Sequence, residues 1–256
     1  MDVYQDYIVL KGINFVDNKY LPFAQYRINT TPIIYDDPII DEPNLLFYLD
    51  GSNTENTTSL IKDLSGNGND FTAKNITLDA TNGAIVFGGN GYLVNETLQP
   101  ISTVDDIFSI EVVLECSLFT KEHYSVLGLG TNSPNRLTYR LKSVEGDGDI
   151  YVDFGNAPNV DLFSTKGGTI DIDFIKKSHI VIVKEANTLK SYVNGTFNKS
   201  ATLPEETSTI SIDPRVVIGA KYDLSKNFLD GKIYMFKLYT RVLTDEEVLN
   251  KYNMTK

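Results

Sequence analysis

The chain contains no tryptophan and a single cysteine, and each absence narrows what it can do. One cysteine cannot form an internal disulfide, and it cannot supply a multi-cysteine zinc site. Tryptophan often provides the aromatic surface on which a sugar ring packs, so any such surface here must come from tyrosine or phenylalanine. The sequence has 15 tyrosines and 13 phenylalanines, which is enough to build one.

Positive charge is also scarce, since 23 Lys and Arg residues stand against 34 Asp and Glu residues. The formal net charge is −11. A surface of this sign repels phosphate backbones, so the composition argues against a nucleic-acid partner. It does not argue against calcium, because acidic side chains attract divalent cations.

Long apolar runs are missing, and we therefore expect no membrane insertion. The first residues, MDVYQDYIVLKGI, carry acids where a signal peptide has positive charge, and their apolar run is short. Both features are unlike an export signal. The sequence is thus expected to lack one.

What the chain does have is a set of short alternating segments. In Phe108–Leu118 every second residue is apolar, which is typical of a strand with one buried face. Cys116 falls on that apolar face and is expected to be a buried, inert thiol. Further strands are expected at residues 45–50, 125–129, 137–143, 150–154, 180–183, 189–193, 216–218 and 232–239, with strand, turn and strand in 83–93. Strands of this length with frequent turn signals predict a two-sheet antiparallel sandwich.

The last third of the chain carries the sharpest local signals. Asn194-Gly195 is the dipeptide that most favours a two-residue hairpin turn, because both residues accept positive φ. The sequence from Thr244 to Glu247 reads as a capping box that opens a short helix, with acids in its first turn. These signals predict a meander of antiparallel strands followed by one C-terminal helix.

Several short motifs occur in an order that resembles the laminin-G-like, concanavalin A-like lectin/glucanase family. They are the run D-L-S-G-N-G-N-D at 63–70, Y-V-N-G at 192–195, I-G at 218–219, F-L-D-G-K-I at 228–233 and R-V-L-T-D-E-E at 241–247. The resemblance spans about Leu45 to Tyr252. It implies an all-β, antiparallel jelly-roll β-sandwich, but not one function, since this fold hosts lectins, adhesion modules, glycan hydrolases and spacers.

Two domains are expected, an N-terminal extended arm at residues 1–43 and the jelly-roll domain at residues 44–256. The arm has short apolar runs at Tyr7–Leu10 and Ile33–Tyr35, punctuated by four prolines, so it should be extended with one or two strands. Two interpretations stay open. The arm either packs back on its own sandwich or anchors the chain to another protein by lending a strand or filling a groove.

Catalytic signals are weak. The hydrolase branch of the family carries an E-x-D-x-x-E strand, whose two catalytic carboxylates lie roughly 5–5.5 Å apart in retaining enzymes. Here Glu145–Asp149 lies in a glycine-rich turn, and Asp171 and Asp173 have no glutamate at the required offset. His123 and His179 lack the context of a catalytic triad, and His179 is expected to be structural. We therefore expect no enzymatic activity, with a glycoside hydrolase of the same fold as an alternative.

Calcium is the one cofactor that the sequence leaves open. The loop 63–70 offers several oxygen ligands, and the resemblance brings Asp50 near it. The candidate calcium ligands are therefore Asp50, Asp63, Asn67 and Asn69. The alternative is that these side chains hydrogen-bond their own turn.

No ligand-binding residue can be assigned from the sequence. Sugar hydroxyls need amide and carboxylate partners beside an aromatic face, and loop residues such as Asn132, Asn135, Tyr222 and Asn227 are of suitable types. They are also ordinary loop residues.

These observations favour a non-enzymatic surface recognition or decoration module. The expected setting is a bacteriophage virion, with the arm at 1–43 bound to other virion or surface proteins and the jelly roll facing a cell-surface glycan. The reasoning is that such adhesion domains work outside cells while no export signal is expected here. The alternative is a lectin-like domain of a secreted bacterial surface protein. Either setting places the protein on a virion surface or outside the cell.

Overall fold

The computed structural model describes residues 2–3, 7–14, 19–29, 42, 44–98, 107–117, 123–130, 137–144, 147–154, 175–186, 188–202 and 215–256. The chain divides into two compact units, Met1–Ile39 and Ile40–Lys256. The division falls somewhat before the boundary at 43 and 44 that the sequence suggests.

The first unit is a small antiparallel sheet of β1 (Asp2–Val3), β2 (Tyr7–Asn14) and β3 (Lys19–Asn29). The sequence indicated one or two strands in this segment, and the hairpin of β2 and β3 extends well beyond Tyr7–Leu10. Pro22 lies in β3, an edge strand of this sheet, at a stretch where the register with β2 shifts. Proline is tolerated there because it has no ladder hydrogen bond to donate. The expected strand at Ile33–Tyr35 lies outside the described residues.

The second unit contains thirteen strands and one helix among its described residues. They are β4 (Leu45–Asp50), β5 (Leu60–Ile61), β6 (Phe71–Asp79), β7 (Ala84–Asn95), β8 (Ile107–Cys116), β9 (His123–Leu129), β10 (Leu137–Val144), β11 (Asp147–Phe154), β12 (Ser178–Glu185), β13 (Thr188–Val193), β14 (Thr196–Thr202), β15 (Val216–Ile218), β16 (Asp230–Tyr239) and α1 (Asp245–Met254). No helix in the described part of the chain has the length and apolar character needed to cross a bilayer.

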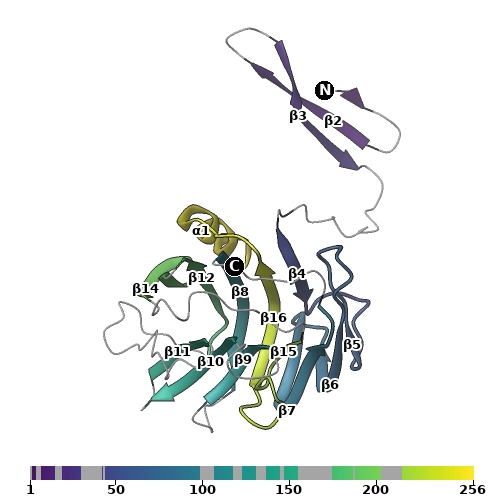
Figure 1. The fold of residues 1–256 in the computed structure, drawn as a ribbon. Coiled ribbons are helices and arrows are strands. Elements are labelled where there is room, and N and C mark those ends of the chain that lie inside the picture. Colours follow the sequence, from purple (N-terminus) through teal and green to yellow (C-terminus); the bar gives the residue numbers. More distant parts are fainter. Residues whose placement is uncertain are drawn as a thin grey trace. The chain divides into compact units, whose positions relative to one another are not determined.

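The strands of the second unit form a sandwich of two layers (Figure 1). One layer, named here the helix-side sheet, has the strand order β4-β16-β8-β12-β13-β14. The other, the far sheet, has the order β6-β7-β15-β9-β10-β11. The two are continuous where the first residues of β16 pair with β7, from Asp230 opposite Gly88 to Ile233 opposite Ile85. The predicted antiparallel jelly-roll sandwich with a short C-terminal helix is confirmed.

The main hydrophobic core lies between the two layers. Phe47 of β4 and Phe236 of β16 are fully buried, with ring centroids 5.7 Å apart, and Phe71 of β6 packs edge-on against Phe47 at 5.0 Å. Burial of one such side chain contributes about 1.5–3 kcal/mol. Cys116 is buried in the same core, and burial raises the pKa of its thiol to about 12. The prediction that Cys116 is buried is confirmed.

The outer face of the helix-side sheet is the surface that positions the site. Residues that alternate with the core positions point outward here, so Lys237 of β16 stands beside Tyr48 of β4 on one side and Glu111 of β8 on the other. Helix α1 covers part of this face through Val248, which packs in a second, smaller cluster with Tyr239 and residues of β12 and β13.

The two sharpest local predictions are confirmed. Asn194 and Gly195 have φ values of 50° and 76° and join β13 to β14 as a two-residue turn. The side chain of Thr244 accepts a hydrogen bond from the Glu247 amide, and the Glu247 carboxylate accepts one from the Thr244 amide. Helix α1 therefore begins with a complete capping box.

The structure differs from the sequence-based strands at three places, one of them a strand that the sequence analysis did not identify. β6 (Phe71–Asp79) was missed because it follows a turn-rich run and its alternation is broken at Asn75, which has a φ of 52° where the register with β7 shifts. The segment 83–93 is not strand, turn and strand but one strand, β7, which bends at Gly89 with φ 77° and keeps its pairing on both halves. Asp147 and Asp149 belong to β11 rather than to a turn.

Candidate functional site

The turn at 63–70 protects the free edge of β4. Among the described residues β4 pairs with β16 alone, which leaves its other edge without a neighbouring strand. On that edge the Tyr48 amide donates to Asp63 Oδ1 at 2.9 Å, and the Asn69 side-chain amide donates to the Leu46 carbonyl at 2.8 Å. An unpaired edge is a template for aggregation, so this turn has a clear structural task.

The four candidate calcium ligands are used differently. Both oxygens of Asp63 accept two hydrogen bonds each from protein donors, namely Tyr48 N, Ser65 N, Ser65 Oγ and Asn69 N. Asn67 donates its amide to the Leu45 carbonyl at 2.8 Å. Asp50 is bound by the hydroxyl of Tyr48, whose backbone amide binds Asp63, so the length of one tyrosine side chain separates the two carboxylates.

As arranged, these side chains do not fit a calcium cage. Within the described ranges no cluster of three or more His, Cys, Asp or Glu side chains is placed to hold a metal. The calcium hypothesis stays a prediction, which melting temperatures measured with calcium and with a chelator can test. A calcium-dependent rise that Asp63→Asn abolishes would support it.

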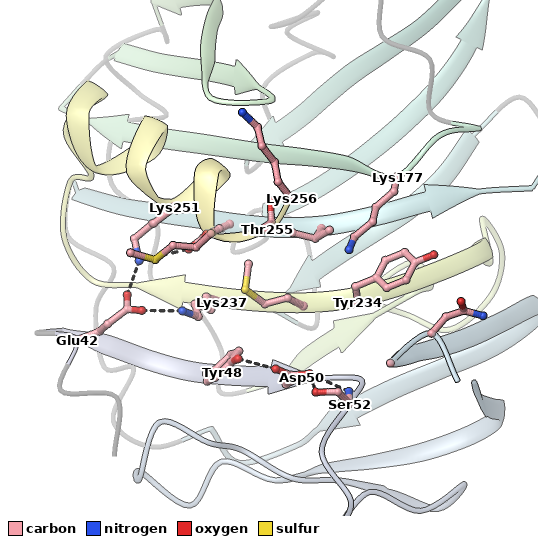
Figure 2. A pocket seen from close by; sticks show the side chains of 16 residues that line it. Glu42, Tyr48, Asp50, Ser52, Lys177, Tyr234, Lys237, Lys251, Thr255 and Lys256 are labelled. Carbon is pink, nitrogen blue, oxygen red and sulfur yellow. Dashed lines mark hydrogen bonds and ion pairs between the residues drawn. The ribbon is translucent and has the colours of Figure 1, made fainter. Parts of the chain in front are cut away.

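A pocket of about 380 Å³ opens on the outer face of the helix-side sheet, between the end of β4, the middle of β16 and the end of α1 (Figure 2). Its lining residues are Glu42, Tyr48, Asp50, Ser52, Asn82, Gly83, Glu111, Val113, Lys177, Tyr234, Met235, Lys237, Lys251, Met254, Thr255 and Lys256. Of the sequence-predicted site residues, Asp50 alone lines it.

A β-bulge in β16 turns Tyr234 toward the pocket. Ile233 pairs with Leu114 and Met235 with Val113, so Tyr234 is the extra residue on its strand. Bulges re-aim side chains and are enriched beside functional sites. Burial and then a hydrogen bond to Glu115 raise the pKa of Tyr234 to about 12, so its hydroxyl is neutral near pH 7.

Glycine at position 51 lets the wall of the pocket close. A Cβ on Gly51 would lie 2.6 Å from Ala84 Cα and 2.7 Å from the Gly83 carbonyl oxygen, both of them backbone atoms. The Gly51 amide donates to the Tyr234 carbonyl at 2.8 Å. The end of β4, the β6–β7 turn and the bulge are thereby held together.

Polar groups line this wall. Asp50 Oδ1 accepts hydrogen bonds from the amide and hydroxyl of Ser52 at 2.8 and 2.6 Å, and Asp50 Oδ2 accepts one from the Tyr48 hydroxyl at 2.7 Å. Asn82 donates its side-chain amide to Asp79 at 2.7 Å, which fixes the amide plane and leaves its carbonyl oxygen as an acceptor. Carboxylate, hydroxyl and amide groups therefore stand beside the ring of Tyr234.

At the opposite end of the pocket lies a set of buried charges. Glu42 accepts hydrogen bonds from Lys237, Lys251 and Tyr239, each at 2.6 Å. Glu111 is 1% exposed, so its charge needs partners, and it has the Tyr239 hydroxyl at 2.7 Å and His179 Nε2 at 3.0 Å. The Tyr239 hydroxyl has one proton and two carboxylates in reach, so it serves one of them at a time.

The charges at this end stay fixed over a wide pH range. Burial alone would raise the pKa of Glu42, but the hydrogen bonds from Lys237, Lys251 and Tyr239 outweigh it and lower the pKa to about 2. Burial opposes ionisation of Glu111 too, and the hydrogen bond from His179 together with the two lysines lowers its pKa. A glycosidase acid needs a raised pKa to be protonated at neutral pH, and neither carboxylate meets that condition.

Sequence reasoning missed this set and most of the pocket. Glu42 lies in a proline-rich segment assigned to the arm, and nothing local marks it as a partner of Lys237 or Lys251. The run K-I-Y-M-F-K-L-Y in β16 held a signal, because Lys237 interrupts an otherwise apolar alternation. His179 is buried against Glu111, and Tyr222 is 9% exposed, which makes it a poor sugar contact. Asn132 and Asn135 lie outside the described residues.

Solved structures of similar fold include the binding domain of botulinum neurotoxin serotype D/C, with a TM-score of 0.63 and 13% identity over 83% of this chain and 52% of that chain. Another structure shows a botulinum neurotoxin DC binding domain in complex with SialylT, with a TM-score of 0.61 and 14% identity over 84% of this chain and 52% of that chain. Trypanosoma rangeli sialidase matches with a TM-score of 0.62 and 18% identity, over 81% of this chain and 32% of that chain.

The chain thus spans about half of the toxin chain and about a third of the sialidase chain. At these identities the similarity shows the fold. A sequence comparison with curated proteins finds no match. Residues 87–249, more than half of the chain, match the family model of the concanavalin A-like lectin/glucanases superfamily. The protein is therefore a member of the concanavalin A-like lectin/glucanase superfamily.

Proposed function

We propose that this protein is a non-enzymatic surface recognition module and that it binds a cell-surface glycan in the pocket beside α1. The observation that carries the proposal is the meeting of an aromatic side chain, Tyr234, with the polar groups of Asp50, Ser52 and Asn82 in one concavity. A sugar ring has an apolar face and hydroxyl edges, so it needs both kinds of surface.

Each residue has a definite task in this proposal. Tyr234 offers apolar ring surface, which in a chain without tryptophan must come from such a residue. Asp50 and the free carbonyl oxygen of Asn82 accept hydrogen bonds from sugar hydroxyls. The bulge in β16 and the close packing at Gly51 hold these groups in place before the ligand arrives, which limits the ordering entropy on binding.

The charges of the pocket support binding rather than hydrolysis. Glycoside hydrolysis needs a protonated carboxylic acid and a second carboxylate on either side of the scissile bond. Glu42 and Glu111 are paired with lysines and a histidine and have lowered pKa values. Asp50 is the remaining pocket acid, and it is held by the hydroxyls of Tyr48 and Ser52.

The comparisons support recognition of a glycan in coarse terms. The toxin domain of similar fold binds SialylT, and another structure shows it in complex with rat synaptotagmin II. This chain matches about half of the length of those toxin chains, so the two complexes support a binding role in coarse terms. The pocket chemistry of this chain favours a glycan ligand.

The binding test is a glycan array probed with the full chain, with and without calcium, followed by calorimetry on the retained glycans. Tyr234→Ala should lower affinity at least about tenfold, since stacking and area burial are lost together. Tyr92→Ala is the matched control, because Tyr92 lies on β7 and does not line the pocket. Equal loss in both variants, or none in either, would contradict the assignment of the site.

We also propose the setting in which the module works, a virus particle of a bacterial host, with the first unit as its anchor. Support comes from the compact sheet of β1–β3, which another protein can grip without unfolding the sandwich. A deletion of residues 1–39 should abolish incorporation into particles and leave glycan binding unchanged. The deletion should end at residue 39, because Glu42 is bound to Lys237 in the second unit and must be kept. Incorporation of the shortened chain would refute the anchoring role.

The alternative setting is a lectin-like domain of a secreted bacterial surface protein. Fractionation separates the two: a virion protein is recovered with purified particles, and a secreted surface protein with the cell wall or the medium.

A further inference from the structure

We propose that the recognised glycan carries an acidic group, a carboxylate or a sulfate, and that Lys177 binds it. This inference rests on the proposed function and names its ligand class. The side chains around the pocket include more lysines than acids, although the chain as a whole is strongly acidic.

The pocket is lined by three acidic side chains and by four lysines: Glu42, Asp50, Glu111, Lys177, Lys237, Lys251 and Lys256. Two of the lysines are engaged, since Lys237 and Lys251 each bind Glu42 at 2.6 Å. Glu111 is bound by His179 and Tyr239. Asp50 is bound by the hydroxyls of Tyr48 and Ser52, so each of the three acids has an internal partner.

The other two lysines have no carboxylate partner among the described residues. Lys177 directly precedes β12, and its Nζ lies over the Tyr234 ring at 4.6 Å from the ring centre. Lys256 has its Nζ 4.5 Å from the centre of the Tyr252 ring and 3.0 Å from Asn253 Oδ1. Both side chains are exposed. In a chain of net charge −11, a pocket lysine without a carboxylate partner can attract an anion, and Lys177 is the one that lies beside Tyr234.

Figure 2 shows how Lys177 lies relative to the proposed sugar contacts. Lys177 and Tyr234 lie side by side at one end of the pocket, and Glu42 with its lysines lies at the other. An acidic substituent at Lys177 would therefore leave the sugar ring beside Tyr234 and its hydroxyls near Asp50. Lys256 adds positive charge at the rim, with its ammonium turned toward Tyr252.

The overall negative charge of the protein does not prevent this contact. At physiological ionic strength the Debye length is about 8 Å, so distant acids are largely screened while a direct ion pair is much less so. A hydrogen bond between charged partners also places the acidic group in a defined position. An uncharged sugar could accept a hydrogen bond from Lys177, but it would leave the charge of Lys177 without a counter-ion.

The experiment compares neutral, carboxylated and sulfated glycans on one array, using the full chain and its variants. We expect the retained glycans to carry an acidic group, and Lys177→Gln to weaken their binding about tenfold. Lys226→Gln is the matched control, since it removes the same charge from an exposed side chain outside the pocket. Added salt should weaken binding by the parent chain more than by the Lys177 variant. The carboxylated and sulfated arms show which acidic group is preferred.

The failures are distinguishable. Suppose that neutral glycans are retained, that Tyr234→Ala abolishes their binding and that Lys177→Gln does not. The acidic-ligand inference is then wrong, while the proposed function stands. If no glycan of any class is retained, both are wrong.

Discussion

The two ends of the pocket are built from similar residue types and behave in opposite ways. At the Glu42 end, acids and lysines meet each other under α1 and leave nothing for a ligand. At the Tyr234 end, Lys177 lies over the tyrosine ring and has no carboxylate partner among the described residues. It stands beside a wall of polar groups that includes Asp50. The comparison shows that a charged side chain in a pocket points to a ligand only when it is not already paired with another side chain of the protein.

The largest expected effect on stability is at the Glu42 end of the pocket, called here the closed end because its charges pair with one another. The Tyr234 end is called the open end. Glu111→Ala should destabilise the fold by about 3–5 kcal/mol, because it leaves His179 and Lys251 without their buried carboxylate. Urea unfolding measures the difference. Glu185→Ala is the control, since Glu185 forms an exposed pair with Lys190 at 3.7 Å and should change stability by about 0–1 kcal/mol. Similar losses in both variants would show that the Glu111 end is not a buried charge set.

The next effect concerns the wall of the open end. Gly51→Ala should destabilise the fold by about 1–3 kcal/mol, because its Cβ meets the backbone of Gly83 and Ala84. It should also weaken glycan binding by shifting the bulge at Tyr234. Gly88→Ala is the matched control, as a Cβ there meets nothing within 4 Å. A Gly51 variant as stable as the control would contradict the close packing described above.

Acid should weaken the closed end in a defined pH window. The folded-state pKa of Glu42, about 2, is below its ordinary value of 4.5, so its stabilisation is complete above pH 4.5 and is lost as the pH falls through 2. Allowing for solvent screening of a carboxylate that is 20% exposed, this amounts to about 2 kcal/mol. Urea midpoints measured between pH 5 and pH 2 should fall, and Glu42→Gln should flatten this part of the profile. An unchanged slope would contradict the role of Glu42.

The smallest expected effect on stability is at Lys177. Because this side chain is exposed and has no carboxylate partner among the described residues, Lys177→Gln should change the free energy of unfolding by less than about 0.5 kcal/mol. If the parent chain and Lys177→Gln have equal melting curves and unequal glycan-binding curves, Lys177 contributes to binding and not to stability. A clear loss of stability would mean that Lys177 has a structural partner.

Much of the fold could be predicted from the sequence, because its signals are local. The Asn194-Gly195 turn and the Thr244 capping box depend on backbone preferences within four residues, and both occur as expected. The strand β6 was missed because an irregularity at Asn75 interrupts its alternation. The site could not be predicted, since it joins Asp50, Lys177 and Tyr234 from three separate strands or strand ends, and only the sheet register brings them together.

The D-x-S-G-N motif at residues 63–67 was found in the sequence, but its use in the protein could not be predicted. Its oxygens and amides suggested a metal loop, and in the structure they hydrogen-bond the edge of β4. Turn-forming residues and cation ligands are the same residue types, so the sequence alone could not separate the two uses.

The position of Glu42 has a mechanical consequence. It lies on the segment that joins the two units, just ahead of β4, and it is bound to Lys237 and Lys251. Along the chain, the two ion pairs of Glu42 therefore precede the hydrogen bonds between β4 and β16. Under the anchoring role proposed above, a pull from the N-terminal side would reach these ion pairs first.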